Sequence, residues 1–153
     1  MSPSTDRIER SVLLKAPRSR VWHALSNAEE FGSWFGVNFK GQTFAVGKIT
    51  KGSVTYKGYQ HITMEVLIER LEPERVLEWR WHPAAIDPNV DYSSEPMTTV
   101  VFELEDAGGG TRLTVVESGF DRIPPARRAA VIRTNTNGWD GQMQSIEKHL
   151  AAG

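Results

Sequence analysis

The sequence predicts an α+β domain in which one layer of antiparallel strands packs against a long C-terminal helix. Short alternations of apolar and polar residues, punctuated by glycine-containing turns, recur through residues 37–118. Two short helical patterns precede them, and an apolar stripe at helical spacing runs through residues 125–151. The 153 residues are enough for one domain with a hydrophobic core. We therefore expect a single domain over residues 1–153, with its core at about residues 8–150.

The first strand is expected at residues 6–15. Alternation places Ile8, Arg10, Val12 and Leu14 on one face and mostly polar side chains on the other. One charged residue, Arg10, therefore shares the face that should turn toward the core.

Two short helices should follow almost without a loop between them. Pro17 can open the first, because proline is favoured at the first helical position, and the pattern continues to Asn27. The second is expected at residues 27–36, where it carries Trp34 and Phe35 among its aromatic residues.

A strand at residues 75–82, RVLEWRWH, holds two tryptophans two positions apart. Side chains at i and i+2 share one face of a strand, so Leu77, Trp79 and Trp81 should point inward together. Two neighbouring indoles could fill the core, or they could border a cavity.

The C-terminal part begins with a long polar loop at residues 83–96 and a hairpin built around the turn AGGGTR. The glycines of this turn join two strands, whereas a phosphate-binding loop joins a strand to a helix, so no nucleotide site is expected there. Pro124 and Pro125 then open a helix of roughly 25 residues. Its expected apolar stripe consists of Ile132, Trp139, Met143, Ile146 and Leu150.

The composition excludes several classes of protein. There are no cysteines, so disulfides, thiolate metal sites and Fe–S clusters are ruled out. The four histidines have no metal-ligand spacing, and we expect no metal and no cofactor. The formal net charge of -1 and the absence of a long apolar run give no reason to expect a nucleic-acid or membrane partner. A cytoplasmic location is the default expectation.

Glu117 is the strongest candidate for chemistry. Strand parity places it with Leu113 and Val115 on the inner face of its strand, where an ionised carboxylate needs a partner. We hypothesise a structural pair between Arg10 and Glu117, since the first and last strands should be neighbours. Three interpretations stay open for Glu117: a buried pair that fixes the register, a ligand-orienting or acid–base residue, and an exposed side chain.

Two polar residues of the final helix, Arg128 and Asn135, fall on the same helical face as Trp139. Either this face reaches solvent there, or the two side chains lie at a pocket and orient a polar group of a ligand. Gly138 and Gly141 weaken the helix, and close approach to the sheet or to a short loop is the expected reason, with a chemical role as the alternative. The aromatic residues could form a core or wall a pocket. The ligand-binding candidates are Trp34, Phe35, Tyr56, Trp79, Trp81, Glu117, Arg128, Asn135 and Trp139.

Five segments, in order, resemble the START-like (SRPBCC) superfamily, in its subgroup similar to the C-terminal domain of the activator of Hsp90 ATPase. They are APRSRVWHAL, AEEFGSWFG, EPERVLEWRW, GGTRLTVVESGF and GWDGQMQSIEKHL. The resemblance covers residues 8–150 and implies a helix-grip fold, in which a curved seven-stranded antiparallel sheet wraps a long C-terminal helix around an apolar pocket.

Members of this superfamily bind lipids, sterols, polyketides or aromatic metabolites, and some are enzymes, so the fold does not specify a reaction. The resemblance implies binding of a small hydrophobic or aromatic molecule. A cyclase-like or hydrolase-like enzyme using Glu117, and an Hsp90-type chaperone-linked interaction module, are the alternatives. The latter is weakened because 153 residues leave no room for the activator's separate N-terminal domain. An oxidoreductase that needs flavin and nicotinamide domains and an Fe–S cluster is not expected, because the chain has 153 residues and no cysteine. Apolar outer-face residues such as Leu13 and Val76 could be covered in a homodimer.

Overall fold

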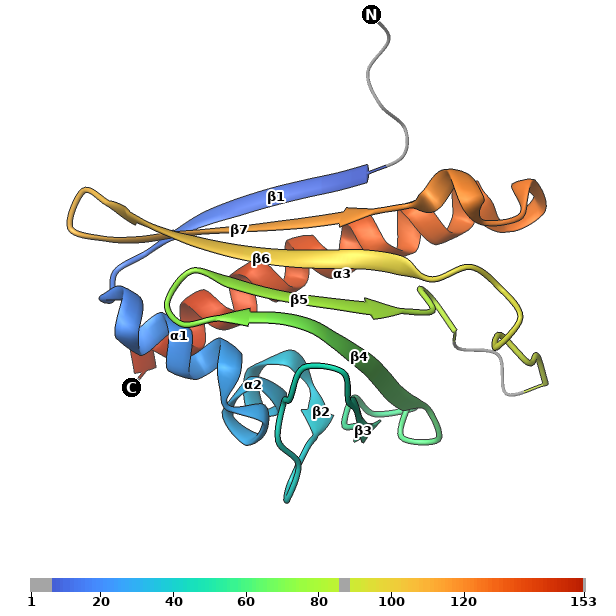
Figure 1. The fold of residues 1–153 in the computed structure, drawn as a ribbon, viewed down its shortest axis with the longest axis horizontal. Coiled ribbons are helices and arrows are strands. Elements are labelled where there is room, and N and C mark those ends of the chain that lie inside the picture. Colours follow the sequence, from blue (N-terminus) through green and yellow to red (C-terminus); the bar gives the residue numbers. More distant parts are fainter. Residues whose placement is uncertain (1–6, 86–88, 153) are drawn as a thin grey trace, which may run out of the picture.

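Seven antiparallel strands form one sheet that curves around a long C-terminal helix (Figure 1). The computed structural model describes residues 7–85 and 89–152. The strand order is β1-β7-β6-β5-β4-β3-β2, so the first and last strands are neighbours, and the predicted helix-grip architecture is confirmed. The strands are β1 (Arg7–Leu14), β2 (Val37–Asn38), β3 (Ile49–Val54), β4 (Thr63–Glu72), β5 (Val76–Trp81), β6 (Thr98–Ala107) and β7 (Gly110–Ser118).

The helices are α1 (Arg18–Ser26), α2 (Ala28–Phe35), the 3-10 turn η1 (Phe120–Arg122) and α3 (Pro125–Ala152). Asn27 ends α1 and caps α2, since its side chain accepts a hydrogen bond from the Glu30 backbone N–H. Gly36 ends α2 with a φ of 96°, a left-handed conformation that suits glycine. The expected near-direct connection between the two helices is confirmed.

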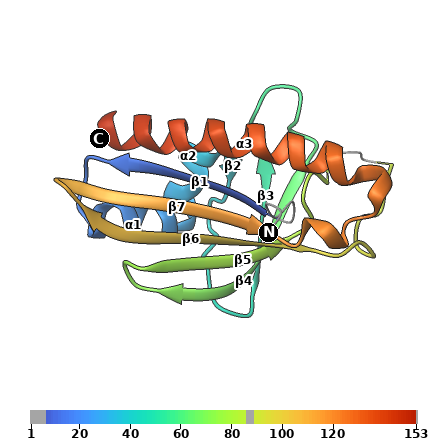
Figure 2. The ribbon, with the colours of Figure 1, turned by 90° about the horizontal axis from the view of Figure 1, so that it is seen from above.

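The long helix α3 lies beside β1, and its C-terminal half contacts α2 (Figure 2). Its buried residues are Val131, Trp139, Met143 and Ile146. The predicted stripe is confirmed at Trp139, Met143 and Ile146, whereas Leu150 and Ile132 are only partly buried and Val131 is the fully buried residue near the start of the helix. Across the described residues, no helix is both long and apolar enough to cross a membrane.

The centre of the core is an aromatic cluster around Phe31 of α2. The Phe31 ring lies 4.8 Å from the Trp34 and Phe35 rings and 5.5 Å from Trp79 of β5, measured between centroids. Phe102 of β6 joins the cluster, 5.1 Å from Trp79. Trp79 is fully buried, which confirms the inward parity predicted for β5. Val76, expected outside, is only 8% exposed.

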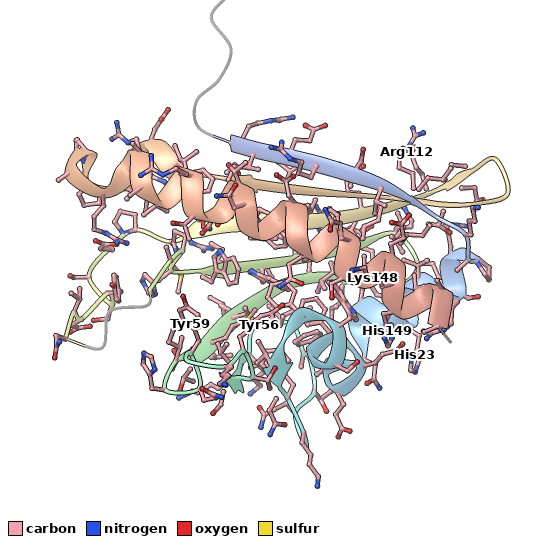
Figure 3. The ribbon with its side chains drawn as sticks, turned by 180° about the vertical axis from the view of Figure 1, so that it is seen from behind. His23, Tyr56, Tyr59, Arg112, Lys148 and His149 are labelled. Carbon is pink, nitrogen blue, oxygen red and sulfur yellow. The ribbon has the colours of Figure 1, made fainter. Side chains whose placement is uncertain are left out.

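A second cluster joins the three helices at the C-terminal end of α3 (Figure 3). The Glu30 carboxylate accepts from His149 and pairs with Arg20, each at 2.7 Å, and it also contacts His23. Burial alone would raise the pKa of Glu30, but the hydrogen bonds from His149, His23 and Arg20 outweigh burial and hold this pKa at about 2. The Glu30 side chain therefore fastens α2 to α1 and α3 as a carboxylate.

Candidate functional site

Glu117 lies in β7 with its side chain fully buried between the sheet and α3. In the sheet register it is opposite Ile8 of β1 and Val100 of β6, two buried apolar residues. The strand alternation that puts Leu113 and Val115 in the core turns the Glu117 carboxylate the same way. The inward orientation expected from parity is what the structure has, and the exposed interpretation is wrong.

Four neutral side chains donate hydrogen bonds to this carboxylate. The indole Nε1 of Trp139 donates to Oε1 at 2.8 Å, and that of Trp81 donates to Oε2 at 2.8 Å. The Thr98 hydroxyl donates to Oε2 at 2.6 Å. Asn135 Nδ2 lies 2.9 Å from Oε1 and 3.1 Å from Oε2. These four residues and Glu117, called the carboxylate cluster below, link β5, β6, β7 and α3.

The donor set of the cluster suits a carboxylate without a counter-ion. Indole and amide N–H groups can only donate, and several donors to one carboxylate form charge-assisted hydrogen bonds. Among residues 7–85 and 89–152, no lysine, arginine or histidine forms an ion pair with Glu117. Neutral dipoles alone therefore offset the cost of burying this group.

The hypothesised pair between Arg10 and Glu117 is wrong. Arg10 lies opposite Val115, and its Nε donates to Asp140 of α3 at 2.6 Å. The Arg10 side chain is 38% exposed and extends from the edge strand to the surface of α3. Parity assigned Arg10 to the helix-facing side, where Ile8 and Leu14 are indeed buried, but at this point of the edge strand the carboxylate within reach is Asp140 of α3 and not Glu117.

A pocket of about 220 Å³ lies against the carboxylate cluster, between α3 and the sheet. Two cluster indoles, Trp81 and Trp139, form part of its wall, with ring centroids 6.0 Å apart. The Phe35 ring lies 6.0 Å from Trp139 and 6.5 Å from Trp81. We call this the α3 pocket. It is lined by Phe35, Trp81, Ala84, Thr134, Asn135, Gly138, Trp139 and Gln142.

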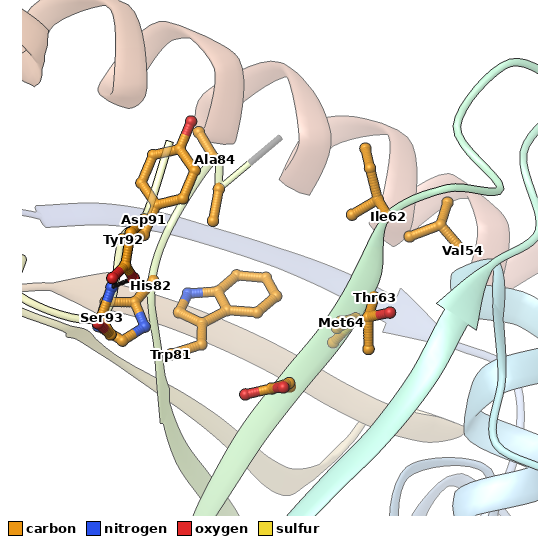
Figure 4. A pocket seen from close by; sticks show the side chains of 12 residues that line it. Val54, Ile62, Thr63, Met64, Trp81, His82, Ala84, Asp91, Tyr92 and Ser93 are labelled. Atoms are coloured by element: carbon orange, nitrogen blue, oxygen red, sulfur yellow. Dashed lines mark hydrogen bonds between the residues drawn. The ribbon is translucent and has the colours of Figure 1, made fainter. Parts of the chain in front are cut away.

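A larger hollow of about 510 Å³, here called the loop pocket, adjoins the α3 pocket and shares Trp81 and Ala84 with it. Figure 4 shows Trp81 between the residues Tyr92 and His82 on one side and Thr63 and Met64 of β4 on the other. The other residues that line the loop pocket include Val54, Ile62, Glu65, Asp91 and Ser93. Trp81 therefore touches both hollows with its ring while its N–H holds Glu117.

Besides Glu117, which is buried behind the wall of the α3 pocket, four ligand-binding candidates lie outside this pocket. Trp34 is 4% exposed and donates from Nε1 to the Ala24 carbonyl at 2.9 Å, so it belongs to the core. Trp79 is fully buried beneath the pocket. Tyr56 is half exposed over Gly36 (Figure 3).

The fourth of these candidates, Arg128, serves the backbone at the start of α3. Its Nη2 donates to the carbonyls of Asp121 and Ile123, at 2.8 and 3.1 Å. The two polar residues predicted on one face of α3 therefore have different roles. Arg128, in the first turn, packs on η1, whereas Asn135, two turns later, reaches Glu117.

Sequence reasoning missed Ala84 and Thr134 of the pocket wall, and it also missed two residues that local patterns would have found. Thr98 follows the alternation of Val100 and Phe102 along β6, so the same parity would have placed it inward. Gln142 lies seven positions after Asn135 and three after Trp139, so helical spacing would have placed it on their face of α3.

The helix glycines do not approach the sheet closely. A Cβ on Gly138 or Gly141 would meet nothing within 4 Å among its described neighbours. The expected close approach is therefore wrong. Gly138 lines the α3 pocket, whereas Gly141 does not, so the missing side chain at Gly138 leaves space beside Trp139.

Comparisons with known proteins agree with this architecture. The family model described as activator of Hsp90 ATPase homolog 1-like protein matches residues 15–151. No curated protein matches the sequence.

Several solved structures share the fold. Protein MLL2253 from Mesorhizobium loti is 21% identical, with a TM-score of 0.71 over 95% of this chain and 97% of its own. The Aha1 dimer from Colwellia psychrerythraea is 17% identical, with a TM-score of 0.67 over 94% of this chain and 95% of its own. DynU16, from the dynemicin biosynthetic locus, is 21% identical, with a TM-score of 0.72 over 97% of this chain and 48% of its own. At these identities the likeness shows the fold alone.

Proposed function

Because the chain belongs to the family of activator of Hsp90 ATPase homolog 1-like proteins, we propose that it uses its helix-grip fold to bind a small hydrophobic or aromatic molecule. The α3 pocket carries this proposal. Phe35, Trp81 and Trp139 give it aromatic walls, and none of the described residues that line it is charged. Concave, mostly apolar pockets with a few fixed polar groups are typical of small-molecule sites.

The geometry of Glu117 favours binding over catalysis. A general acid or base must come within hydrogen-bonding reach of the substrate. Both carboxylate oxygens already accept from two or three donors, and the side chain is fully buried behind Trp81 and Trp139. Glu117 is best described as a positioning residue that holds the two indoles in place.

The fold of DynU16 supports a role with small molecules, since that protein belongs to a biosynthetic locus. The Aha1 relative is a dimer, and a homodimer of this chain is a further proposal, supported by the 46% exposed Leu13 on the outer face of β1. A cytoplasmic location is also proposed, and a chaperone-linked interaction module remains the alternative function; neither of them follows from the pocket.

A glycine pair on α3 provides the test. Gly138→Leu would extend a side chain into the α3 pocket, whereas Gly141→Leu adds the same side chain to the same helix outside it. Native mass spectrometry of the freshly purified protein would compare the bound mass in both variants and the wild type. Tryptophan fluorescence would then follow binding of added aromatic molecules, because two indoles line the pocket.

We expect bound small molecules on the wild type and on Gly141→Leu, and a loss of at least about tenfold in affinity for Gly138→Leu. Equal binding by the two variants would place any ligand elsewhere. Absence of binding to the wild type, both in native spectra and with added aromatic molecules, would contradict the proposed function.

A further inference from the structure

The α3 pocket is small for the site of a whole ligand. Its volume is about 220 Å³, whereas pockets that bind small molecules usually measure about 300–1,000 Å³. A cavity of about 150 Å³ can hold one benzene molecule. The α3 pocket therefore accommodates one aromatic ring with little space to spare, and a larger ligand has to extend beyond it.

The loop pocket offers that extension on the same face of the sheet. It is lined by Val54 of β3, Met64 of β4 and Trp81 of β5, and strand alternation places all three on the side of the sheet that faces α3. The volume of the loop pocket, about 510 Å³, is enough for a second ring with its substituents.

The boundary between the two hollows is formed by one fixed ring and one small side chain. Among the described lining residues, Trp81 and Ala84 belong to both hollows. The hydrogen bond to Glu117 holds the Trp81 ring in place. Ala84 has a φ of 51°, a left-handed conformation that is strained for alanine, and such strain is concentrated at binding sites. A ligand in the α3 pocket can therefore continue along the Trp81 ring into the loop pocket.

The two hollows differ in the side chains around them. The α3 pocket presents the rings of Phe35 and Trp139, which are buried. The loop pocket presents Thr63, Asp91 and Ser93, which are polar and exposed. A polar group at this end of a ligand stays in contact with water, so it keeps its hydration.

From the size of the α3 pocket, its junction with the loop pocket and this difference in polarity, we infer that the ligand is an elongated aromatic molecule that spans both hollows. One ring lies in the α3 pocket, and a second part with a polar end lies in the loop pocket against Trp81. This inference rests on the proposed function and specifies the length and the orientation of its ligand.

Two probes that differ by one phenyl ring test the inference. Benzyl alcohol and 4-biphenylmethanol carry the same hydroxymethyl group, and isothermal titration calorimetry measures the affinity of each. We expect 4-biphenylmethanol to bind the wild type at least about tenfold more tightly, because its second ring is also buried. In ¹H–¹³C spectra the methyl signal of Met64, which lines the loop pocket, should move with 4-biphenylmethanol and stay in place with benzyl alcohol.

A pair of isoleucines provides matched variants. Ile62, in the turn before β4, lines the loop pocket (Figure 4), so Ile62→Trp fills part of that hollow. Ile49 of β3 is 54% exposed and lines neither hollow, so Ile49→Trp is the control. Ile62→Trp should reduce the advantage of 4-biphenylmethanol to less than about threefold and leave the affinity for benzyl alcohol unchanged. Gly138→Leu should weaken both probes, and Ile49→Trp should behave like the wild type.

The outcomes separate the inference from the proposed function. If benzyl alcohol binds the wild type as tightly as 4-biphenylmethanol, or if the Met64 signal does not move, the inference is overturned and a one-ring pocket remains. A folded Ile62→Trp variant that keeps the full advantage of the longer probe would also overturn the inference. If neither probe binds the wild type, both the inference and the proposed function fail. The calorimetric and spectroscopic comparisons on the wild type do not depend on any variant folding.

Discussion

The substitution Glu117→Gln tests whether the buried carboxylate organises the interior of the domain. It keeps the shape of the side chain but replaces one acceptor oxygen with an NH₂ group that can only donate. If the NH₂ takes the place of Oε2, the Thr98 hydroxyl can turn to accept, but the Trp81 N–H loses its acceptor. If it takes the place of Oε1, it faces the N–H groups of Trp139 and Asn135. At least one indole N–H is left unsatisfied in either orientation.

The cost follows from these contacts. One lost hydrogen bond to a buried charged group is worth about 1.5–3 kcal/mol, and the remaining donors exchange charge-assisted bonds for weaker neutral ones. Part of this cost is offset because a neutral amide is easier to bury than a carboxylate. We expect a net loss of about 2–4 kcal/mol in the free energy of unfolding. For a domain of this size the melting temperature should fall by about 5–15 °C.

Equilibrium urea unfolding followed by tryptophan fluorescence and circular dichroism measures this loss. The control is Glu103→Gln, the same change at an exposed position of β6, which should alter stability by less than about 0.5 kcal/mol. In ¹H–¹⁵N spectra, two of the five indole N–H signals should move in the Glu117→Gln variant. If Glu117→Gln is as stable as the wild type, or if no indole signal moves, the carboxylate does not organise the cluster.

Two further predictions concern side chains that join α3 to the rest of the domain. The depressed pKa of Glu30 means that its contribution to stability is complete above its ordinary pKa of 4.5 and is lost as the pH falls from there toward about 2. Since this cluster lies near the surface and solvent screens it, the loss should be about 1–2 kcal/mol, measured by urea unfolding across that window. The Glu30→Gln variant should lack this component, and an identical pH dependence in the variant would contradict the assignment. Asn135→Leu removes a donor shared by both Glu117 oxygens, so it should lower the free energy of unfolding by about 1–3 kcal/mol. Asn137→Leu, at an exposed position two residues away, should cost less than about 0.5 kcal/mol, and equal effects of the two would rule out a special role for Asn135.

Local periodicity predicted the fold because each strand and helix carries its own pattern. Alternation along β7 placed Glu117 inside, and helical spacing placed Asn135 and Trp139 on one face of α3. The same parity placed Trp81 on the inner face of β5. Their convergence on one carboxylate depends on how far α3 lies from β5 and β7, and that separation is set by the packing of the whole core around Phe31.

The predictions that the structure contradicts, and the candidate Tyr56 that it places outside the α3 pocket, have a common physical origin. Arg10 has the right parity, but its partner depends on the edge position of β1 and on where Asp140 falls along α3. Tyr56 follows β3 in a loop, where no periodicity indicates which way a side chain points. Gly138 shows the same limit, because a glycine that leaves a hollow and a glycine that allows close packing look alike in sequence.

The shared role of Trp81, Trp139 and Asn135 divides the wall of the α3 pocket into two kinds of position. Each of these three residues supports both the pocket and the buried carboxylate, so a change that alters ligand preference there also weakens the junction of sheet and helix. Thr134, Gly138 and Gln142 border the same pocket without touching Glu117. Substitutions at these three positions of a single helix can therefore reshape the pocket without disturbing the carboxylate cluster, while the opposite wall of the pocket stays constrained by folding.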